Sequence, residues 1–508
     1  MIIRDILEHN ARIHPSRVAI SAKKDEVTYR ELHRRVLDRA AALTALGITR
    51  GDRVGVLAHN TVKFVELFFA ATHIGAAVVQ LHHMFVSREM TVILQDARVK
   101  ALFYEEDLED KVGEIRAALS ETPEFYRMED PRTIAPEEGA EPVGNPPFPD
   151  TEIAMVIYTT GPEGRPRGAM LSHRNLMAAS VYSAMELGFS RKDVFLSCAT
   201  LPYLGGVGRM LRFFHVGATI ILQKEFDPIE VLRTIERRSV THVVLTPTMM
   251  YRILDAPDAE RFNLATLKLV LYGGAWISVD LLKRAMGFFR CGLVQSYAHV
   301  ETTGVLTFLH EEDHTMDDRT PYMKKLMSAG QEAVGVQVRV VDEEGREAEE
   351  GMLGEVVARG RNVFAGYLND PKSTAEVLRD GWLYTGDMAA LDEEGYLYIV
   401  DRKRDTLMVE SVTVSLKEIE NILCEHPSVK EAAVVGRPDY TMGEVPVAVV
   451  VLKEGEKEDP EAILEHCRRN MAPFKVPRAV EYVSVFPRNA QGKVLKATIR
   501  DRVAARGR

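Results

Sequence analysis

Hydrophobic and polar positions follow helical and strand periods in turn along most of the chain. The stretch Thr28–Glu31 has the Thr-x-x-Glu form of a capping box. The apolar positions after it predict a helix that runs to about Leu46, where Gly47 can end it. Continuous apolar runs bounded by polar residues predict buried strands. The clearest of these runs are 153–157, 243–247 and 267–274. Helices and strands that alternate in this way are typical of α/β layers.

The pattern changes after about residue 330. Strand-like runs such as Val336–Val341 alternate with glycine-containing turns up to residue 400, which predicts a β-rich subdomain. The charged run Asp401–Asp405 follows, and we interpret it as a linker. Beyond it, helices are predicted near 415–424 and 462–471, and strands at 429–435 and 445–452. We therefore expect an α/β protein with a large multi-layer N-terminal domain, which carries the β-rich subdomain, and a small α+β C-terminal domain.

Composition narrows the class of protein. A chain of 508 residues exceeds a single core, so two or more domains are expected. A net charge of −10 without a Lys/Arg-rich block argues against nucleic-acid binding. The chain has no run of 18 apolar residues, so no membrane span is expected, and Met1–His9 lacks the pattern of a signal peptide. Four widely spaced cysteines favour a reduced, cytoplasmic enzyme, whose oligomeric state the sequence leaves open.

The run Tyr158–Gly168 carries the most chemistry. It follows a predicted strand, and its three glycines in eight residues suit a loop whose backbone N–H groups surround an anion. With the Leu171–Asn175 segment after it, the run resembles the signature loop of the adenylate-forming superfamily: acyl-CoA synthetases, peptide-synthetase adenylation domains and luciferases. In that family the loop holds the phosphates of ATP. The resemblance implies a nucleotide-binding set here, namely Thr159, Thr160, Gly161, Gly164 and Arg167.

The loop departs from the family pattern where the phosphates would lie. The family's Thr-Thr pair is replaced by Pro162 and Glu163, and its Lys by Arg167. Pro162 has no N–H to donate. Glu163 places a negative charge near a triphosphate, and a like-charge contact at ~4 Å is unfavourable by roughly 4 kcal/mol at a surface-like dielectric. A metal ion or the arginines at 165 and 167 could offset this repulsion.

A second match is Gln295–Glu301, which resembles the family's Tyr-Gly-x-Thr-Glu segment. Tyr297 and Glu301 correspond, whereas Val300 replaces the Thr. The resemblance implies that Tyr297 stacks on adenine and that Glu301 is a catalytic residue that binds Mg²⁺. These roles need an aromatic face and a hard oxygen ligand.

The third match, Gly381–Asp387, has the family's Trp-x-x-Thr-Gly-Asp form. Its carboxylate can accept from both ribose hydroxyls, so the resemblance implies that Asp387 binds the nucleotide. In the strand that follows, Arg402 is expected to contact the ribose or the α-phosphate. Arg404 falls at the family's hinge position.

The fourth match lies near the end of the chain. Phe486–Lys496 resembles the family's C-terminal Pro-Arg-x-x-x-Gly-Lys loop. The resemblance implies that Lys493 is the catalytic lysine of adenylation. It would contact the substrate carboxylate and the α-phosphate and stabilise the charge that develops between them.

Weaker matches point to the acyl and adenosine pockets. Gly273, Gly274 and Ala275 resemble a turn that lines both pockets, and Leu201–Gly206 resembles a Pro-x-x-His segment with Gly205 in place of His. The acyl pocket is expected to be largely apolar, suited to an aromatic or extended aliphatic acid. Its predicted residues are Tyr203, Gly205, Trp276 and His299. Glu410 would narrow the family's path for a phosphopantetheine arm.

Together the four matches imply an AMP-forming acid–thiol ligase, an acyl-CoA synthetase of the fatty-acid-metabolism type. A carboxylic acid attacks the α-phosphorus of Mg·ATP to give acyl-AMP. The C-terminal domain then turns about Arg404, and CoA takes the acyl group. The expected parts are an N-terminal domain (1–401), a hinge (402–404) and a mobile C-terminal domain (405–508).

Two alternatives remain open on the sequence. One is a divergent enzyme of the same fold that acts on ready-made acyl-AMP or acyl-CoA and uses ATP poorly, as Pro162, Glu163 and Val300 suggest. The other is a non-catalytic ligand-binding descendant. Retention of Lys493 together with Asp387 and Glu301 argues against the second.

Overall fold

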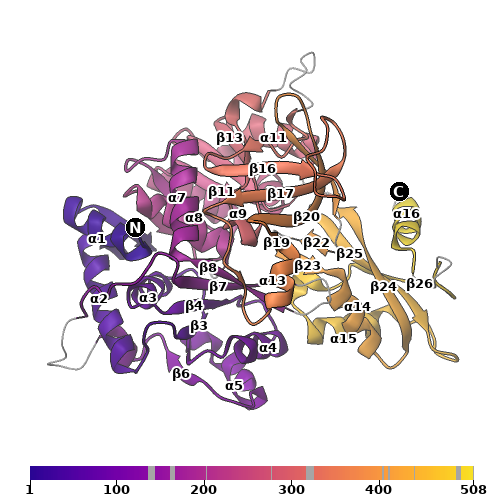
Figure 1. The fold of residues 1–508 in the computed structure, drawn as a ribbon, viewed down its shortest axis with the longest axis horizontal. Helices are drawn as coiled ribbons and strands as arrows, with labels where there is room; N and C mark the ends of the chain where they lie inside the picture. The colour runs from indigo at the N-terminus through magenta and orange to yellow at the C-terminus, as the bar shows by residue number, and fades with distance from the viewer. Residues whose placement is uncertain are drawn as a thin grey trace.

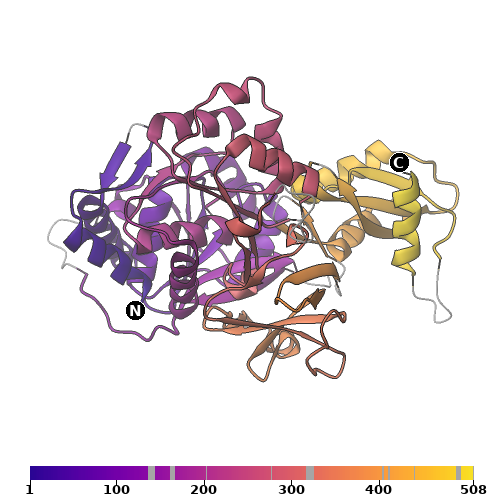
Figure 2. The ribbon, with the colours of Figure 1, turned by 90° about the horizontal axis from the view of Figure 1, so that it is seen from above.

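The computed structural model describes residues 1–23, 25–135, 143–160, 166–201, 203–275, 277–315, 325–402, 406–409, 412–439, 441–487 and 494–506. Within these ranges the strands form four sheets, named here A to D (Figure 1). Sheets A and B build the N-terminal domain, sheet C forms the β-rich subdomain, and sheet D belongs to the C-terminal domain. Seen from above, the C-terminal domain projects to one side, in yellow (Figure 2). The predicted fold class is confirmed.

Sheet B holds the first half of the N-terminal domain, in the order β18-β8-β7-β4-β3-β5-β6. Its inner strands are parallel and almost wholly buried, as expected for strands covered by helices on both faces. The strands are β3 (Arg53–Leu57), β4 (Ala77–Leu81), β5 (Ala101–Tyr104), β6 (Glu124–Arg127), β7 (Ile153–Thr160), β8 (Pro166–Ser172) and β18 (Gly366–Tyr367). The sequence analysis did not predict strand β6, because its short, half-exposed run carries no clear apolar period.

Sheet A has the order β15-β14-β13-β12-β11-β9-β10-β1-β2, and its strands from β1 to β13 are mostly parallel. The strands are β1 (Val18–Ala22), β2 (Asp25–Thr28), β9 (Val194–Ser197), β10 (Thr219–Leu222), β11 (His242–Leu245), β12 (Leu269–Gly273), β13 (Gly292–Tyr297), β14 (Thr307–Leu309) and β15 (Gln331–Glu332). The three apolar runs predicted as buried strands are strands in the structure. The run 153–157 lies in β7, 243–247 overlaps β11, and 267–274 contains β12.

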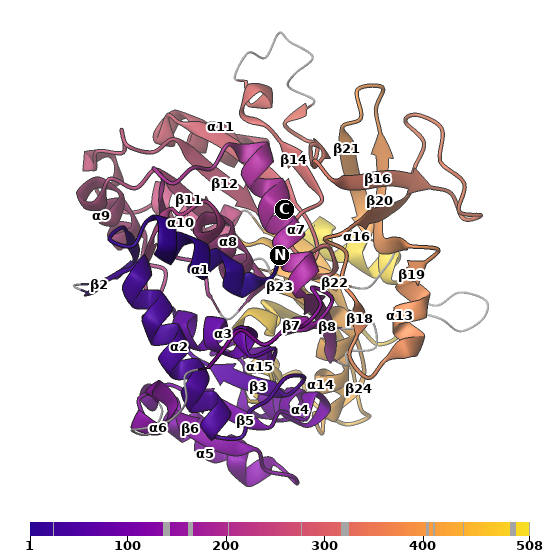
Figure 3. The ribbon, with the colours of Figure 1, turned by 60° about the vertical axis from the view of Figure 1, so that its left-hand side comes forward.

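Helices pack between and around the two sheets. Helices α1, α2, α3, α7 and α8 contact one another in a layer between sheets A and B (Figure 3). The helices are α1 (Ile3–Ile13), α2 (Tyr29–Ala45), α3 (Val62–His73), α4 (Ser87–Ala97), α5 (Glu109–Ala118), α6 (Pro131–Ile134), α7 (His173–Leu187), α8 (Leu204–His215), α9 (Pro228–Arg238), α10 (Pro247–Leu254) and α11 (Val279–Phe289), with 3₁₀ turns η1 (Glu106–Leu108), η2 (Ala259–Arg261), η3 (Val300–Thr302) and η4 (Glu311–Asp313). Local signals act as predicted, since the Thr28 hydroxyl accepts from Glu31 N at the start of α2 and Gly47, at φ +80°, follows its end. In the part of the chain that is described, no helix is long and apolar enough to cross a membrane.

Sheets C and D are smaller and mainly antiparallel. Sheet C contains β16 (Val336–Val341), β17 (Gly354–Gly360), β19 (Leu378–Arg379), β20 (Trp382–Leu391) and β21 (Leu397–Arg402), with α13 (Pro371–Val377) beside it. Sheet D contains β22 (Thr406–Val409), β23 (Val412–Ser415), β24 (Val429–Asp439), β25 (Gly443–Leu452) and β26 (Ala479–Tyr482), with α14 (Leu416–Glu425), α15 (Pro460–Asn470), η5 (Pro473–Lys475) and α16 (Lys496–Arg506). The chain therefore passes from sheet C to sheet D between Arg402 and Thr406, where the hinge was predicted. Arg404 lies outside the described residues.

The C-terminal domain docks against the sheet B side of the N-terminal domain. The ring centroids of Phe474 and Phe85 lie 6.3 Å apart across this interface. The Lys475 ammonium lies 2.5 Å from Glu89 Oε1 of the N-terminal domain and 2.8 Å from Glu418 Oε1 of its own domain. Apolar side chains and a buried ion-pair group thus hold the two domains in this arrangement.

Candidate active site

A cavity of about 710 Å³ lies where sheets A and C meet the C-terminal domain. Four of the sheet A segments that line it directly follow the carboxyl ends of parallel strands: Ala199 after β9, Thr246 after β11, Gly274 after β12 and Ala298 after β13. Crevices outside the carboxyl ends of parallel strands are where open α/β sheets bind their ligands. The topology of sheet A therefore places the candidate site.

Most of the site residues predicted from the sequence meet in this cavity. The residues that line it are Thr159, Arg167, Tyr203, Gly205, Gly274, Ala275, Tyr297, His299, Glu301 and Asp387. They come from sheets A, B and C and from α8, so the chain segments that carry the first three motifs converge on one space. The roles of these residues remain predictions.

The other predicted residues divide into three groups. Gly273 is buried at the end of β12 and does not line the cavity. A Cβ there would lie 2.2 Å from the Ser296 carbonyl oxygen, so the absence of a side chain allows the two strands to pack. Thr160 and Arg402 end β7 and β21, and their side chains are not described. Outside the described residues lie Gly161, Pro162, Glu163, Gly164, Trp276, Arg404, Glu410 and Lys493.

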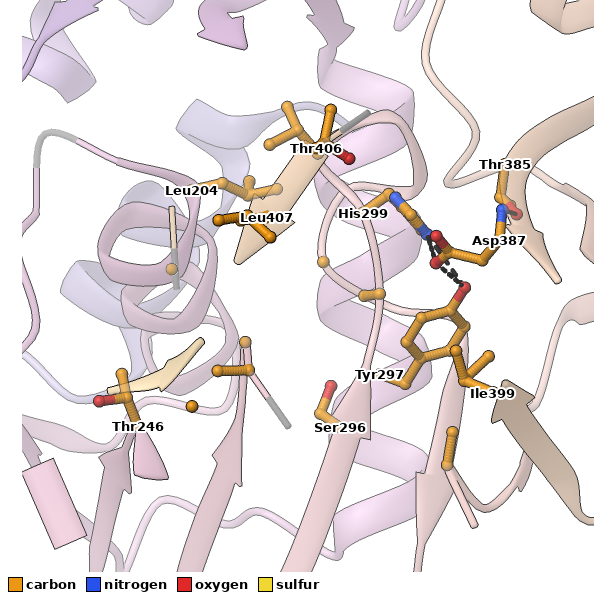
Figure 4. A pocket seen from close by; sticks show the side chains of 18 of the residues that line it. Leu204, Thr246, Ser296, Tyr297, His299, Thr385, Asp387, Ile399, Thr406 and Leu407 are labelled. Atoms are coloured by element: carbon orange, nitrogen blue, oxygen red, sulfur yellow. Dashed lines mark hydrogen bonds and ion pairs between the residues drawn. The ribbon is translucent and has the colours of Figure 1, made fainter. Parts of the chain in front are cut away.

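Tyr297, His299 and Asp387 form a hydrogen-bonded triangle in the cavity (Figure 4). The Tyr297 hydroxyl donates to Asp387 Oδ2 at 2.7 Å, and His299 Nε2 lies 3.0 Å from the same oxygen. The Tyr297 oxygen and His299 Nε2 are also 3.0 Å apart. Asp387 comes from β20 of sheet C and is 3% exposed. The triangle therefore joins sheet A to sheet C and fixes the orientation of a carboxylate in the cavity.

Glu301 and Arg167 are linked through Tyr367 of β18. The Tyr367 hydroxyl donates to Glu301 Oε1 at 2.7 Å, and the Arg167 guanidinium lies 5.5 Å from the centre of the Tyr367 ring. Arg167 Nε is also 3.5 Å from Asp370 Oδ2. The Gln295–Glu301 segment thus lies against β8, the strand that follows the glycine-rich run. A carboxylate oxygen is a hard ligand of the kind that Mg²⁺ prefers, and the role of Glu301 remains a prediction.

Sequence reasoning missed two arginines of α8 that line the cavity, Arg209 and Arg212. Together with Gly205 they occupy positions i, i+4 and i+7 of the helix, which lie on one face. This spacing was visible in the sequence and could have predicted that all three share the pocket. The expected acyl pocket was largely apolar, but these two cations also line the cavity in the structure, since both lie on the face of α8 that carries Gly205.

The C-terminal domain closes one side of the cavity. Thr406 and Leu407 of β22 lie across from His299 (Figure 4). The other C-terminal lining residues are Leu416, Gly436, Pro438, Gly443, Glu444 and Arg500. Phe486 and Val494, which flank the loop of Lys493, instead pack in a separate core between β24, β25 and α16, and neither lines the cavity. Among the described residues of this domain, β22, the start of α14, the β24–β25 hairpin and α16 are therefore the parts presented to the site.

Comparison with known proteins agrees with this geometry. The model of the AMP-binding enzyme family matches residues 7–368, and that of the AMP-binding enzyme C-terminal domain matches residues 418–493. The chain belongs to the AMP-binding enzyme family. It is 34% identical over 498 residues to a feruloyl-CoA synthase from Amycolatopsis sp, with 97% of each chain covered. These findings confirm the predicted adenylate-forming superfamily and the class of AMP-forming acyl-CoA ligases.

Solved structures of two proteins are similar to this one over nearly their whole length. The amide bond synthetase McbA from Marinactinospora thermotolerans is 30% identical with a TM-score of 0.90, and 99% of each chain is covered. A double mutant of o-succinylbenzoate CoA synthetase from Bacillus subtilis, bound with a product analogue, is 26% identical with a TM-score of 0.87 and 98% of each chain covered. The Bacillus subtilis enzyme in complex with AMP has the same identity and coverage, but its TM-score is 0.72. The present structure as a whole is thus more similar to the product-analogue complex than to the AMP complex.

Proposed function

We propose that the protein activates a carboxylic acid with ATP through an acyl-AMP and transfers the acyl group to CoA. The observation that carries this proposal is the convergence of Tyr297, Glu301 and Asp387 on one cavity at the carboxyl ends of the sheet A strands. A descendant that only binds ligands would not need these three side chains together. Its proposed location is the cytoplasm.

The nucleotide side of the proposal rests on the triangle around Asp387. The carboxylate is held by the Tyr297 hydroxyl and by His299, so it is already oriented to accept hydrogen bonds from two ribose hydroxyls. Tyr297 offers an aromatic face next to Gly274 and Ala275, where a purine can approach the backbone closely. A preoriented acceptor loses little entropy on binding, which favours nucleotide affinity.

The phosphate side of the proposal rests on Thr159, Arg167 and Glu301. Arg167 contributes positive charge, and Thr159 offers a hydroxyl at the end of β7. Glu301 would hold Mg²⁺, because Tyr367 occupies only Oε1 and Oε2 has no hydrogen bond among the residues described. The ion would supply charge that neutralises phosphate oxygens. We propose Lys493 as the cation of the adenylation step, brought to the site by movement of the C-terminal domain about Arg404.

The second half of the reaction is supported by the domain arrangement. The β24–β25 hairpin presents Gly436 and Gly443 to the cavity, and Gly443 has a positive φ of +81°. Gly436 accommodates Leu407, since a Cβ there would lie 2.4 Å from Leu407 Cδ2. We propose that Gly443 leaves room for a narrow thiol-bearing arm to reach an acyl-AMP. The TM-score of 0.87 with the product-analogue complex, against 0.72 for the AMP complex of the same enzyme, supports assigning this arrangement to acyl transfer.

The experiment that tests the proposal is carboxylate-dependent exchange of pyrophosphate into ATP across a panel of acids. Thioester formation would be followed by mass spectrometry with CoA, and with a primary amine as the competing acceptor. Lys493→Ala should abolish exchange and spare transfer from supplied acyl-AMP, while Lys430→Ala, an exposed change on β24, should alter neither. Transfer from supplied acyl-AMP without exchange by the parent would favour the ATP-independent alternative. Acyl-amide without thioester would overturn the assignment of CoA.

A further inference from the structure

The acyl end of the cavity contains two cations that the proposed reaction does not use. Arg209 and Arg212 lie one turn apart on α8, and both line the cavity. Arg212 is 3% exposed, although arginine is rarely buried unless it is paired. A buried charge normally has a hydrogen-bonded partner of opposite sign.

Neither arginine has an acidic partner among the residues described. Arg212 Nη2 donates to the Gly304 carbonyl oxygen at 2.7 Å, but its Nε and Nη1 are buried without a hydrogen-bond partner. Burial lowers the pKa of Arg209 to about 10 and that of Arg212 to about 9, the latter also through repulsion by Arg209. Both groups remain protonated at neutral pH, so two like charges share one apolar wall without compensation.

The pocket has space around these guanidinium groups. A Cβ at Gly205 would lie 3.8 Å from Arg209 Nη1, and a Cβ at Gly304 would lie 3.2 Å from Arg212 Nη2. Gly205 stands where the superfamily has a histidine side chain. Arg209 is half-buried and lines the cavity beside Gly205, whereas Arg212 lines it with only 3% of its surface exposed. Arg212 would have to shift if residue 304 carried a side chain.

A ligand that carries its own negative charge would supply what the pocket lacks. Guanidinium groups match carboxylates in shape, since two parallel N–H groups can bind two oxygens. The activated carboxylate cannot serve this purpose, because it must lie at the nucleotide end, near His299 and Asp387. We propose that the acid activated here is a dicarboxylic acid whose second carboxylate binds Arg212 and Arg209. This inference rests on the proposed function, which it makes specific for a class of substrate.

The test compares acids that differ by one terminal carboxylate: hexanoate with adipate, benzoate with terephthalate, and 3-phenylpropanoate with 3-(4-carboxyphenyl)propanoate. Binding is measured by calorimetry with AMP present, and turnover by pyrophosphate exchange. The parent should favour at least one diacid over its partner by about a hundredfold, the size expected for one or two charge-assisted hydrogen bonds. Arg212→Met should remove this preference and leave the affinity for the monoacid within about threefold, because the lost groups contact only the second carboxylate.

Two further variants separate a binding role from a structural one. Arg212→Lys keeps the charge and should retain part of the preference, whereas Arg237→Met, an exposed change on α9, should leave the preference intact. The Arg212→Met protein should melt no lower than the parent, since it replaces an unpaired buried charge with an apolar side chain. A lower melting temperature with an unchanged diacid preference would overturn the inference in favour of a structural role.

The outcomes distinguish this inference from the proposed function. The dicarboxylate assignment is overturned if only monoacids support pyrophosphate exchange, or if the monoacid and the diacid of every pair bind equally well. Either result leaves the ligase proposal intact. A different result would refute the ligase proposal and support the anion site. In that case diacids bind, Arg212→Met abolishes their binding, and no acid supports pyrophosphate exchange.

Discussion

Lys475→Met should shift the protein away from the docked arrangement of its two domains. The Lys475 ammonium is the cation between Glu89 of α4 and Glu418 of α14, at 2.5 and 2.8 Å, and its side chain is only 6% exposed. Burial opposes its charge, but the two carboxylates outweigh burial and raise the pKa of Lys475 above its ordinary value. The contact with Glu89 exists only while the domains are docked.

The magnitude follows from what the substitution leaves behind. Burial raises the pKa of Glu418 even with Lys475 present, so removal of the cation leaves an acid that must either take up a proton or become exposed. Breaking a buried ion pair by removing one partner costs about 3–5 kcal/mol. Undocking relieves part of that cost, so the docking equilibrium can shift by up to about two to three and a half orders of magnitude.

Arg88→Met is the matched control. Arg88 pairs with Glu425 across the same interface, but the two side chains are 52% and 45% exposed. An exposed pair of this kind contributes about 0.2–1 kcal/mol, so its loss should shift docking less than about fivefold.

The assay is energy transfer between dyes on the two domains, combined with the rate of acyl transfer from supplied acyl-AMP. Lys475→Met should lower the docked fraction and the transfer rate, and Lys475→Met combined with Glu418→Gln should recover part of both. An effect no larger than that of Arg88→Met would refute the reasoning, because burial would then have no influence on the strength of the pair.

Asp387→Ala should weaken AMP binding by roughly tenfold or more without lowering the melting temperature much, because two ribose hydroxyls lose a charged acceptor; equal affinity in calorimetry would contradict this. The change Pro162→Thr with Glu163→Thr should raise the affinity for ATP and leave that for AMP nearly constant, with a gain that shrinks as salt rises; an unchanged ATP affinity at low salt would rule it out. Acid should destabilise the fold through His173, which is fully buried, accepts from Ile3 N, and has a pKa that burial lowers to about 3. The unfolded chain takes up this proton near pH 6.5, so stability should fall as pH drops from 6.5 toward 3, by about 1.4 kcal/mol per pH unit. Urea titrations at pH 7, 5.5 and 4.5 should show a shallower loss for His173→Gln than for the parent.

Short-range patterns in the sequence determined the elements and most of the site. Strand β16 matches the apolar run Val336–Val341 from end to end, because alternate burial along a strand can be read from neighbouring residues. Asp387 and Tyr297 could be named from motifs of a few residues, because those motifs resemble segments of the adenylate-forming superfamily. The chain alone also predicted a domain boundary near residue 401, and the structure passes from sheet C to sheet D between Arg402 and Thr406. The division into domains stays a prediction.

Only the tertiary structure decided which of these side chains interact. The hydrogen bond between Tyr297 and Asp387 joins residues 90 positions apart, and Lys475 meets Glu89 across 386 positions. Arg212 looks like any surface arginine in the sequence, yet the fold buries it, and no acid among the described residues pairs with it. The physical reason is that the energy of a charged group depends on its burial and on its partners. Elements far apart in the chain supply both, so no local pattern records them.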